Sequence, residues 1–245
     1  MSKVEIVRSG RVKERVLDPT EDTYDVEIEK KANIRPQSFE HYIGQNLVKE
    51  NLQVYVNASV KMNKQVDHII LHGPPGLGKT TLAKIVASSL NVPLYETRGP
   101  AIDHPGSLAG ILMSLEPGSV LFIDEIHRMS IKVEEILYSA MEDFHLDLLT
   151  GSGPSARPMQ VDLPSFTLIG ATTRMSLLSK PLRDRFGIQE RVEFYSVESL
   201  TEIVMRSAKI LGIDLDVDAG REIACRSRGT PRLANRLLRR VWDFV

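Results

Sequence analysis

The chain has 245 residues, of which 42% are hydrophobic and 26% are charged, so it is long enough for one large globular domain and a smaller one. Its net charge of −1 excludes a polyanion-binding field over the whole molecule, and its single cysteine, Cys225, excludes an intramolecular disulfide and a thiolate-rich metal site. No apolar run approaches the roughly 20 residues that span a bilayer, and the N-terminus lacks the apolar core of a signal peptide. We therefore expect a cytoplasmic location and no membrane partner.

Residues 1–33 alternate charges with few large apolar groups, a composition typical of a loosely ordered arm. From Ile34 onward, strand-like and helix-like segments alternate, which predicts a parallel sheet covered by helices on both faces. The expected segments are, in order, a helix at 47–60, a strand at 68–72, a helix at 79–90, a strand at 93–97, a helix at 106–115, a strand at 119–123 and a helix at 130–143.

A glycine-rich segment, residues 73–80 (GPPGLGKT), lies between the first predicted strand and the helix that follows it. A polyphosphate is bound by backbone N–H groups at a helix N-terminus, which requires a loop nearly free of side chains; here the loop contains Gly73, Gly76 and Gly78. In such a loop the Lys79 ammonium reaches the β and γ phosphates and the Thr80 hydroxyl ligates Mg²⁺. A glycine turn beside a solvated lysine is the alternative, and the strand-loop-helix context disfavours it.

A second apolar strand, residues 120–123, ends in two acidic residues, Asp124 and Glu125. Its composition is that of a buried parallel strand, and ligands of open α/β sheets bind outside the carboxyl ends of such strands. We expect Asp124 to hold the Mg²⁺ shell and Glu125 to orient and polarise the attacking water. Two acids after a strand are common by themselves, but together with the upstream loop they favour nucleotide hydrolysis.

The period of the pattern changes between residues 144 and 165. Residues 145–148 and 159–163 alternate apolar and polar side chains around a turn-rich segment at 151–154, which predicts a β-hairpin inserted before the next core strand. Leu149, near the tip, has no partner in this pattern. A docking surface and an ordinary fold-back of Leu148 and Leu149 onto their own domain both stay open. Residues 166–170 return to the buried-strand pattern and end in polar residues at the ligand edge of the sheet.

The last part of the chain is helical, with helices expected at 196–211, about 216–227 and 231–244, and predicts a small domain attached to the sheet domain. Cys225 lies in an apolar stretch there and is expected to be a buried structural thiol. The final helix carries Arg232, Arg236, Arg239 and Arg240 on one face, opposite Leu233, Leu237 and Val241. Such a stripe is typically solvated or engaged with a neighbouring subunit, and without interleaved aromatic residues it does not indicate a base-reading surface.

Three arginines are candidates for stabilising the charge that develops on a transferred γ-phosphate. Arg183 and Arg185 follow the fourth core strand, beyond easy reach of the phosphate loop of their own subunit. If subunits form a ring, Arg185 is the better candidate for a finger that acts in trans, with Arg183 close by; ordinary surface ion pairing fits their spacing equally well. Arg232, at the start of the final helix, is placed to fold over a bound nucleotide.

Together these segments closely resemble the RuvB family of AAA+ ATPases, the bacterial motors of Holliday-junction branch migration. The resemblance runs from about Ile34 to the last residue and rests on residues 35–36 (RP), 42–45 (YIGQ), 73–80, 124–128 (DEIHR), 170–174, 181–186 and 229–240. It implies an α/β fold with a P-loop AAA+ ATPase core at 34–195, in which a parallel sheet is flanked by helices and carries an inserted hairpin. A small all-helical lid follows at 196–245. The implied assembly is a ring of identical subunits, expected to be a hexamer, that hydrolyses ATP.

The resemblance also implies roles for individual residues. In the family, the adenine-side wall is formed by residues that match Ile34, Arg35, Tyr42 and Ile43, with Tyr195 near the hinge. The phosphate and Mg²⁺ contacts are made by residues that match Lys79, Thr80 and Thr81. Asp124 and Glu125 resemble the Walker B pair, Thr173 the first sensor (asparagine in many related ATPases), Arg185 the trans finger and Arg232 the second sensor. The segment 142–144, which contains Glu142, Asp143 and Phe144, resembles the one that contacts the nucleotide from the neighbouring subunit.

The implied partners are RuvA, on which the hairpin with Leu148 and Leu149 looks able to dock, and four-way junction or duplex DNA. The family continues into a winged-helix domain that grips DNA, whereas this chain ends within the lid, so we expect ATP binding and hydrolysis with weakened action on DNA. Two other functions stay open at this point: an AAA+ loader or remodeller that acts on a protein, and a nucleotide-gated assembly module without motor activity.

Overall fold

The computed structural model describes residues 34–150 and 157–243, which divide into two compact units. The larger unit consists of residues 36–74 and 78–193, and the smaller one of residues 34–35, 75–77 and 194–243. The predicted arm at 1–33 lies outside the described residues. Among the helices that are described, none is both long enough and apolar enough to cross a membrane.

The larger unit is built on a five-stranded sheet with the strand order β2-β3-β6-β1-β7, in which all paired strands are parallel. The strands are β1 (Ile69–His72), β2 (Leu94–Arg98), β3 (Val120–Asp124), β6 (Thr167–Thr172) and β7 (Ile188–Arg191). The three central strands β3, β6 and β1 are almost wholly buried, as expected of parallel strands covered on both faces. This confirms the predicted parallel sheet. β7 was not predicted; it is an edge strand that alternates buried and exposed residues.

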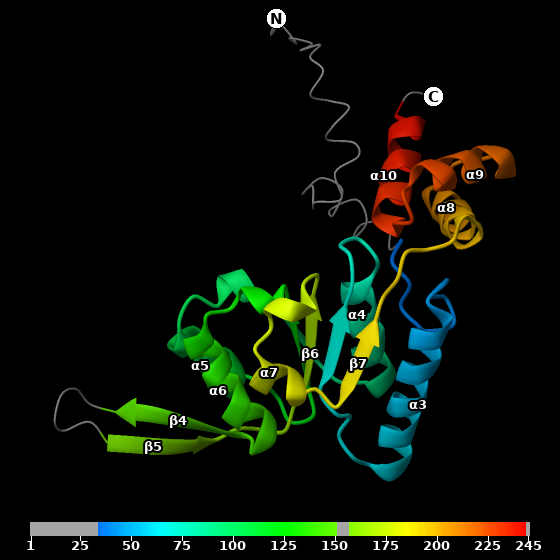
Figure 1. The fold of residues 1–245 in the computed structure, drawn as a ribbon. Helices are drawn as coiled ribbons and strands as arrows, with labels where there is room; N and C mark the ends of the chain where they lie inside the picture. The colour runs from blue at the N-terminus through cyan, green and yellow to red at the C-terminus, as the bar shows by residue number, and fades with distance from the viewer. Residues whose placement is uncertain (1–33, 151–156, 244–245) are drawn as a thin grey trace, which may run out of the picture. The chain divides into compact units, whose positions relative to one another are not determined.

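Helices cover both faces of the sheet, as Figure 1 shows. On one face, α5 (Pro105–Met113) and α6 (Ile131–Glu142) share a core cluster with β3 and β6 that includes Leu121, Leu137 and Leu168. On the other face, α4 (Lys79–Leu90) contacts β3 and β6, and α3 (Asn46–Met62) packs against α4. A short helix, α7 (Lys180–Asp184), connects β6 to β7 and contacts α6.

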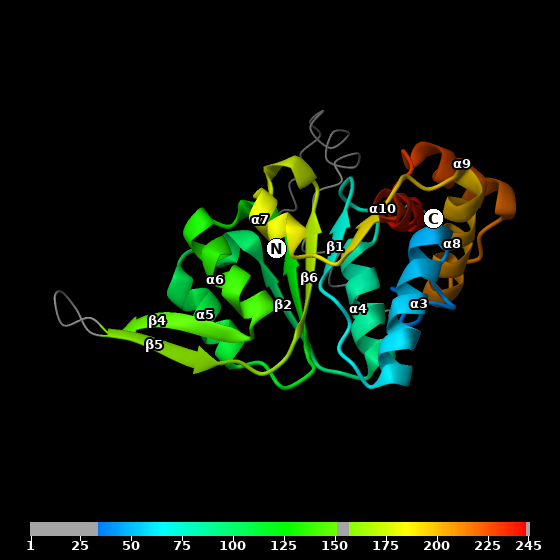
Figure 2. The same cartoon turned by 60° about the horizontal axis from the view of Figure 1, so that its bottom comes forward.

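The predicted hairpin is confirmed as an antiparallel pair, β4 (His145–Thr150) and β5 (Arg157–Asp162). Its first strand is two residues longer than predicted, because Leu149 pairs with Pro158 and Thr150 with Arg157. The expected turn at 151–154 lies outside the described residues. Figures 1 and 2 both show the hairpin extending away from the sheet.

The smaller unit contains α8 (Val197–Leu211), α9 (Val217–Arg226) and α10 (Pro231–Trp242), as the sequence predicted. Ser196 caps the first of these helices, since its hydroxyl accepts the Ser199 N–H at 3.2 Å. The three helices enclose a core formed by Leu200, Val204, Ala224, Ala234 and Leu238.

Two expectations for this unit are wrong. Arg236 and Arg239 are only 5% and 6% exposed, whereas Val241 is 46% exposed, so the final helix does not present a solvated arginine stripe opposite an apolar face. The long aliphatic stem of arginine tolerates such burial. Cys225 is exposed, because α9 turns its neighbour Ile223 toward the core instead.

Candidate active site

The phosphate loop and the acidic pair meet at the carboxyl edge of the sheet. The register pairs His72, the last residue of β1, with Thr172, the last residue of β6, and pairs Ile123 of β3 with Gly170 of β6. The loop follows directly on His72, and Asp124 follows on Ile123. Three neighbouring strands therefore deliver the loop, the acids and the polar residues after β6 to one edge, the usual place for a ligand in an open α/β sheet.

The start of the loop requires glycine. Gly73 has φ +144°, and a Cβ at this position would lie 2.2 Å from the carbonyl oxygen of Val192. The Gly73 N–H donates to the Thr172 carbonyl at 3.1 Å, which fixes the loop to β6. Gly78, with φ 97°, then leads into α4 and provides no side-chain cap for the first N–H groups of that helix. These uncapped donors at a helix N-terminus suit a phosphate.

Lys79 places its charge at the loop itself. Only 7% of the surface of Lys79 is exposed. Its Nζ donates to the carbonyl of Gly73 at 2.9 Å and to that of Pro74 at 2.8 Å. The next two residues, Thr80 and Thr81, lie in the first turn of α4, half-buried and buried respectively. The Lys79 ammonium is therefore held against the loop, and two threonines follow it in the first turn of the helix, the residue order typical of phosphate-binding loops.

The two acids at the end of β3, Asp124 as its last residue and Glu125 directly after it, have different surroundings. The Asp124 carboxylate accepts the N–H of Glu125 at 3.0 Å. Glu125 has φ 50°, in the left-handed region that costs a non-glycine residue roughly 1–2 kcal/mol. Its carboxylate pairs with Arg128 at 3.0 Å, and both side chains of this pair are partly exposed. Backbone strain at the tip of a core strand is typical of a functional site.

The tip of β6 carries a contact that the sequence did not predict. The Thr172 hydroxyl is buried, accepts the Arg174 N–H at 3.0 Å and lies 2.9 Å from Nδ1 of His127. Burial lowers the pKa of His127, while the nearby Glu125 carboxylate opposes that shift. Thr173, the predicted sensor, follows directly and is half-buried. The available signal was the run of polar residues at 171–174 together with the histidine after the acids.

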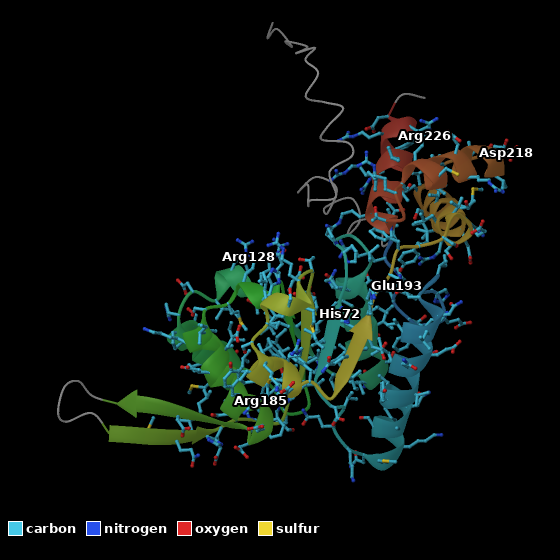
Figure 3. The ribbon with its side chains drawn as sticks, viewed as in Figure 1. His72, Arg128, Arg185, Glu193, Asp218 and Arg226 are labelled. Atoms are coloured by element: carbon cyan, nitrogen blue, oxygen red, sulfur yellow. The ribbon has the colours of Figure 1, made fainter. Side chains whose placement is uncertain are left out.

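Arg183 and Arg185 lie at the opposite edge of the sheet. β7 begins at Ile188, which pairs with Ile69, the first residue of β1, so Arg185 lies near the amino ends of the strands. Figure 3 shows Arg185 and Arg128 toward opposite ends of this unit. Arg183 is half-buried, and its carbonyl accepts the Phe186 N–H at 3.2 Å. The structure thus does not bring either arginine to the phosphate loop of its own subunit.

The predicted neighbour contact lies close to Arg185. Glu142 ends α6 and pairs with Arg185 at 2.9 Å, and Asp143 is exposed. Phe144 packs edge-on against Phe166, with ring centroids 5.8 Å apart. Its ring is therefore part of the core, and within this segment the two carboxylates are the exposed groups.

The remaining predicted site residues divide between the two units. Tyr42 is buried and Ile43 half-buried in the larger unit, whereas Ile34 and Arg35 belong to the smaller one. Within the smaller unit the tip of the phosphate loop contacts the helical segment. The Tyr195 hydroxyl donates to the Leu77 carbonyl at 3.2 Å, and the Arg232 N–H donates to the Gly76 carbonyl at 3.4 Å.

Comparison with known proteins agrees with this arrangement. The family model described as the Holliday junction DNA helicase RuvB P-loop domain matches residues 34–192, and that of the RuvB AAA lid domain matches residues 195–245. Among solved structures, the Thermotoga maritima RuvB Holliday junction branch migration motor is 48% identical with a TM-score of 0.78, over 86% of this chain and 65% of that chain. A lysine-to-arginine mutant of Thermotoga maritima RuvB gives 48% identity and a TM-score of 0.79, over 86% of this chain and 66% of that chain.

The chain thus spans slightly less than two thirds of these relatives, with 66% of the mutant covered. The two family matches cover its phosphate-loop domain and its helical lid in the order in which the sequence presents them. This chain belongs to the RuvB family, with a nucleotide-binding P-loop domain followed by an AAA lid.

Proposed function

We propose that this chain is a subunit of an ATP-hydrolysing ring that drives branch migration of Holliday junctions together with RuvA, in the bacterial cytoplasm. The observation that carries the proposal is the separation of the predicted site residues. Lys79 and Asp124 lie at the carboxyl edge of the sheet, and Arg185 lies near the amino ends of the strands. A site that uses all three therefore needs two copies of the chain.

On one copy, the loop N–H groups and the first turn of α4 are proposed to hold the triphosphate, with Gly76 and Gly78 allowing close approach of the backbone. Lys79 neutralises the β and γ phosphates, and Thr81 supports them from the helix. Ile34, Arg35, Tyr42, Ile43 and Tyr195 are proposed to bind the adenine side. Thr173 and Arg232 are proposed to contact the γ-phosphate as sensors.

The residues present fit Mg²⁺ as the accompanying ion. Magnesium in nucleotide sites typically uses one or two protein oxygens, with phosphates and waters completing the shell. Thr80 and Asp124 supply one hydroxyl and one carboxylate oxygen of this kind. When bound, Mg²⁺ supplies charge neutralisation and orientation of the phosphate oxygens.

Glu125 is proposed to orient the attacking water. For this its carboxylate must leave Arg128, and a partly exposed ion pair of this kind is worth only about 0–1 kcal/mol. The barrier to freeing the carboxylate is therefore small. The neighbouring copy supplies Arg185, assisted by Arg183, and the carboxylates of Glu142 and Asp143 lie on that same side. A trans arginine of this kind is worth a factor of about 10³ to 10⁵ in rate.

The test is ATP turnover by mixtures of two inactive variants. Arg185→Ala removes the trans arginine, and Glu125→Gln removes the water-orienting carboxylate; each alone should be nearly inactive. In a random 1:1 ring, about a quarter of the interfaces combine an intact loop side with an intact arginine side, so activity should return to roughly that fraction. No recovery at any mixing ratio would contradict a shared site.

Partner binding is tested on the hairpin. Replacing Leu148 and Leu149 by serine should abolish RuvA binding and RuvA-dependent movement of a four-way junction, while ATP turnover without RuvA is retained. Asp147→Ser, at an exposed position of the same strand, is the matched control. Unchanged RuvA binding by the double variant would instead favour a loader or remodeller that acts on protein, and multiple turnover of ATP would exclude a passive assembly module.

A further inference from the structure

We infer that Tyr138 is a positioning residue that holds the Arg185 guanidinium ready for a neighbouring subunit. The inference rests on the proposed trans role of Arg185. Tyr138 lies in α6, half-buried against the core of the larger unit. The guanidinium carbon of Arg185 lies 4.7 Å from the centroid of its ring, within the range of a cation–π contact.

Three groups of the same subunit fix the orientation of the guanidinium. The Tyr138 ring contacts its carbon, Glu142 accepts from Nη2 at 2.9 Å, and the Pro181 carbonyl accepts from Nη1 at 2.9 Å. Tyr138 and Glu142 are four residues apart on one helix, so both reach Arg185 from the same face of α6. An arginine side chain loses much rotamer freedom when it is fixed, and fixing it before the neighbour arrives removes that loss from the reaction barrier.

Tyr138 also anchors the helix that carries the arginine. Its hydroxyl lies 2.9 Å from the Ser179 hydroxyl, which caps α7 by accepting the Leu182 N–H at 3.3 Å. Arg185 directly follows the last residue of α7, as its C-cap. A helix of five residues has little stability of its own, so its orientation depends on contacts such as this one. One tyrosine therefore contacts both the start of α7 and the side chain at its end.

The ring and the hydroxyl are separated by two substitutions in the assembled protein. Tyr138→Leu removes the aromatic face, and we expect kcat for ATP to fall roughly 5- to 30-fold with KM changed less than about twofold, the size expected for a partly buried cation–π contact. Tyr138→Phe keeps the ring and removes the contact with the Ser179 hydroxyl, so its kcat should lie between that of Tyr138→Leu and that of the wild type. Turnover by Tyr138→Leu at or above the wild-type rate would overturn the inference, because the ring would then be idle or would restrain Arg185 from acting.

Mixing with Glu125→Gln distinguishes loss of positioning from general damage. The Tyr138→Leu subunit keeps its own phosphate loop, so an intact Arg185 on a Glu125→Gln neighbour should recover turnover as it does for Arg185→Ala. Recovery with Arg185→Ala but not with Tyr138→Leu would overturn the role of Tyr138 and leave the trans site intact. Absence of recovery with Arg185→Ala would instead contradict the proposed function itself. Tyr138→Met, which fills a similar volume without an aromatic face, repeats the test with a second variant and must give the same result.

Discussion

His68 ties three segments of the larger unit together in one protonation state. It directly precedes β1, where its Nδ1 accepts the Leu168 N–H at 2.9 Å and its Nε2 lies 3.0 Å from the Met141 carbonyl. The N–H donor requires Nδ1 to be unprotonated, so Nε2 carries the proton and donates to Met141. The ring is 8% exposed and lies near the rings of Phe144 and Phe166. The substitution His68→Phe retains a ring and removes both nitrogens.

The size and pH dependence of the effect follow from these contacts. At pH 7.5, His68→Phe leaves one buried N–H and one carbonyl unpaired, at about 1–3 kcal/mol each, so the free energy of unfolding should fall by about 2–6 kcal/mol. Burial lowers the pKa of His68 in the folded protein. Below the unfolded pKa of about 6.5 the unfolded chain therefore binds more protons, and the folded protein loses stability as pH falls, by up to about 1.4 kcal/mol per pH unit.

The assay is urea unfolding of both proteins between pH 7.5 and 5.0. The difference in the free energy of unfolding between wild type and His68→Phe should be largest above pH 6.5 and should narrow as pH falls. The wild type loses stability when the His68 imidazole becomes protonated in the unfolded chain, whereas the variant has no imidazole at this position. Burial also lowers the pKa values of His72 and His127, but both residues are present in both proteins and cancel in the difference. A gap that stays constant with pH would refute the assignment of a neutral, doubly bonded His68.

Three further substitutions test other parts of the molecule. Gly73→Ala should lower the affinity for an ATP analogue and should lower the free energy of unfolding by about 1–3 kcal/mol, because the added Cβ would lie 2.2 Å from the Val192 carbonyl oxygen. An affinity equal to that of the wild type would contradict this geometry. Thr172→Val should lower the free energy of unfolding by about 1–3 kcal/mol and reduce kcat more than nucleotide affinity, since it unpairs the Arg174 N–H; an unchanged kcat would show that the hydroxyl has no part in turnover. Phe166→Ala removes a side chain with 0% exposure and should cost about 3–5 kcal/mol in urea unfolding, and a cost below about 1 kcal/mol would mean that the core collapses around the gap.

The elements of the fold were predictable where one interaction dominates. The central strands are short apolar runs because both of their faces are covered, and glycines, prolines and polar clusters mark their ends. β7 was missed because it contains only one large apolar residue, Ile188, and pairs along one side only. Glu190 in that strand is 8% exposed and accepts from Asn51 at 3.0 Å, a tertiary contact with no local signal. The burial of Arg236 in α10 is likewise a tertiary effect, which helical periodicity alone does not contain.

The candidate site divides in the same way. The segments around Lys79 and Asp124 were predictable because phosphate binding imposes a local pattern of glycines, a lysine and acids after strands. The contact between Thr172 and His127 was not, since it joins residues 45 positions apart through a strand order that is not sequential. The contact between the Arg185 guanidinium and the Tyr138 ring depends equally on tertiary packing, because it requires α6 and α7 to lie side by side.

The location of Arg185 at the amino ends of the strands has a consequence for ATP hydrolysis at protein concentrations too low for ring assembly. On the proposed arrangement a lone subunit holds a nucleotide without the cation that speeds its cleavage, so idle copies waste little ATP. ATP turnover per chain should then rise steeply with protein concentration and level off once rings are complete. A rate per chain that does not depend on concentration across the assembly threshold would contradict the shared site.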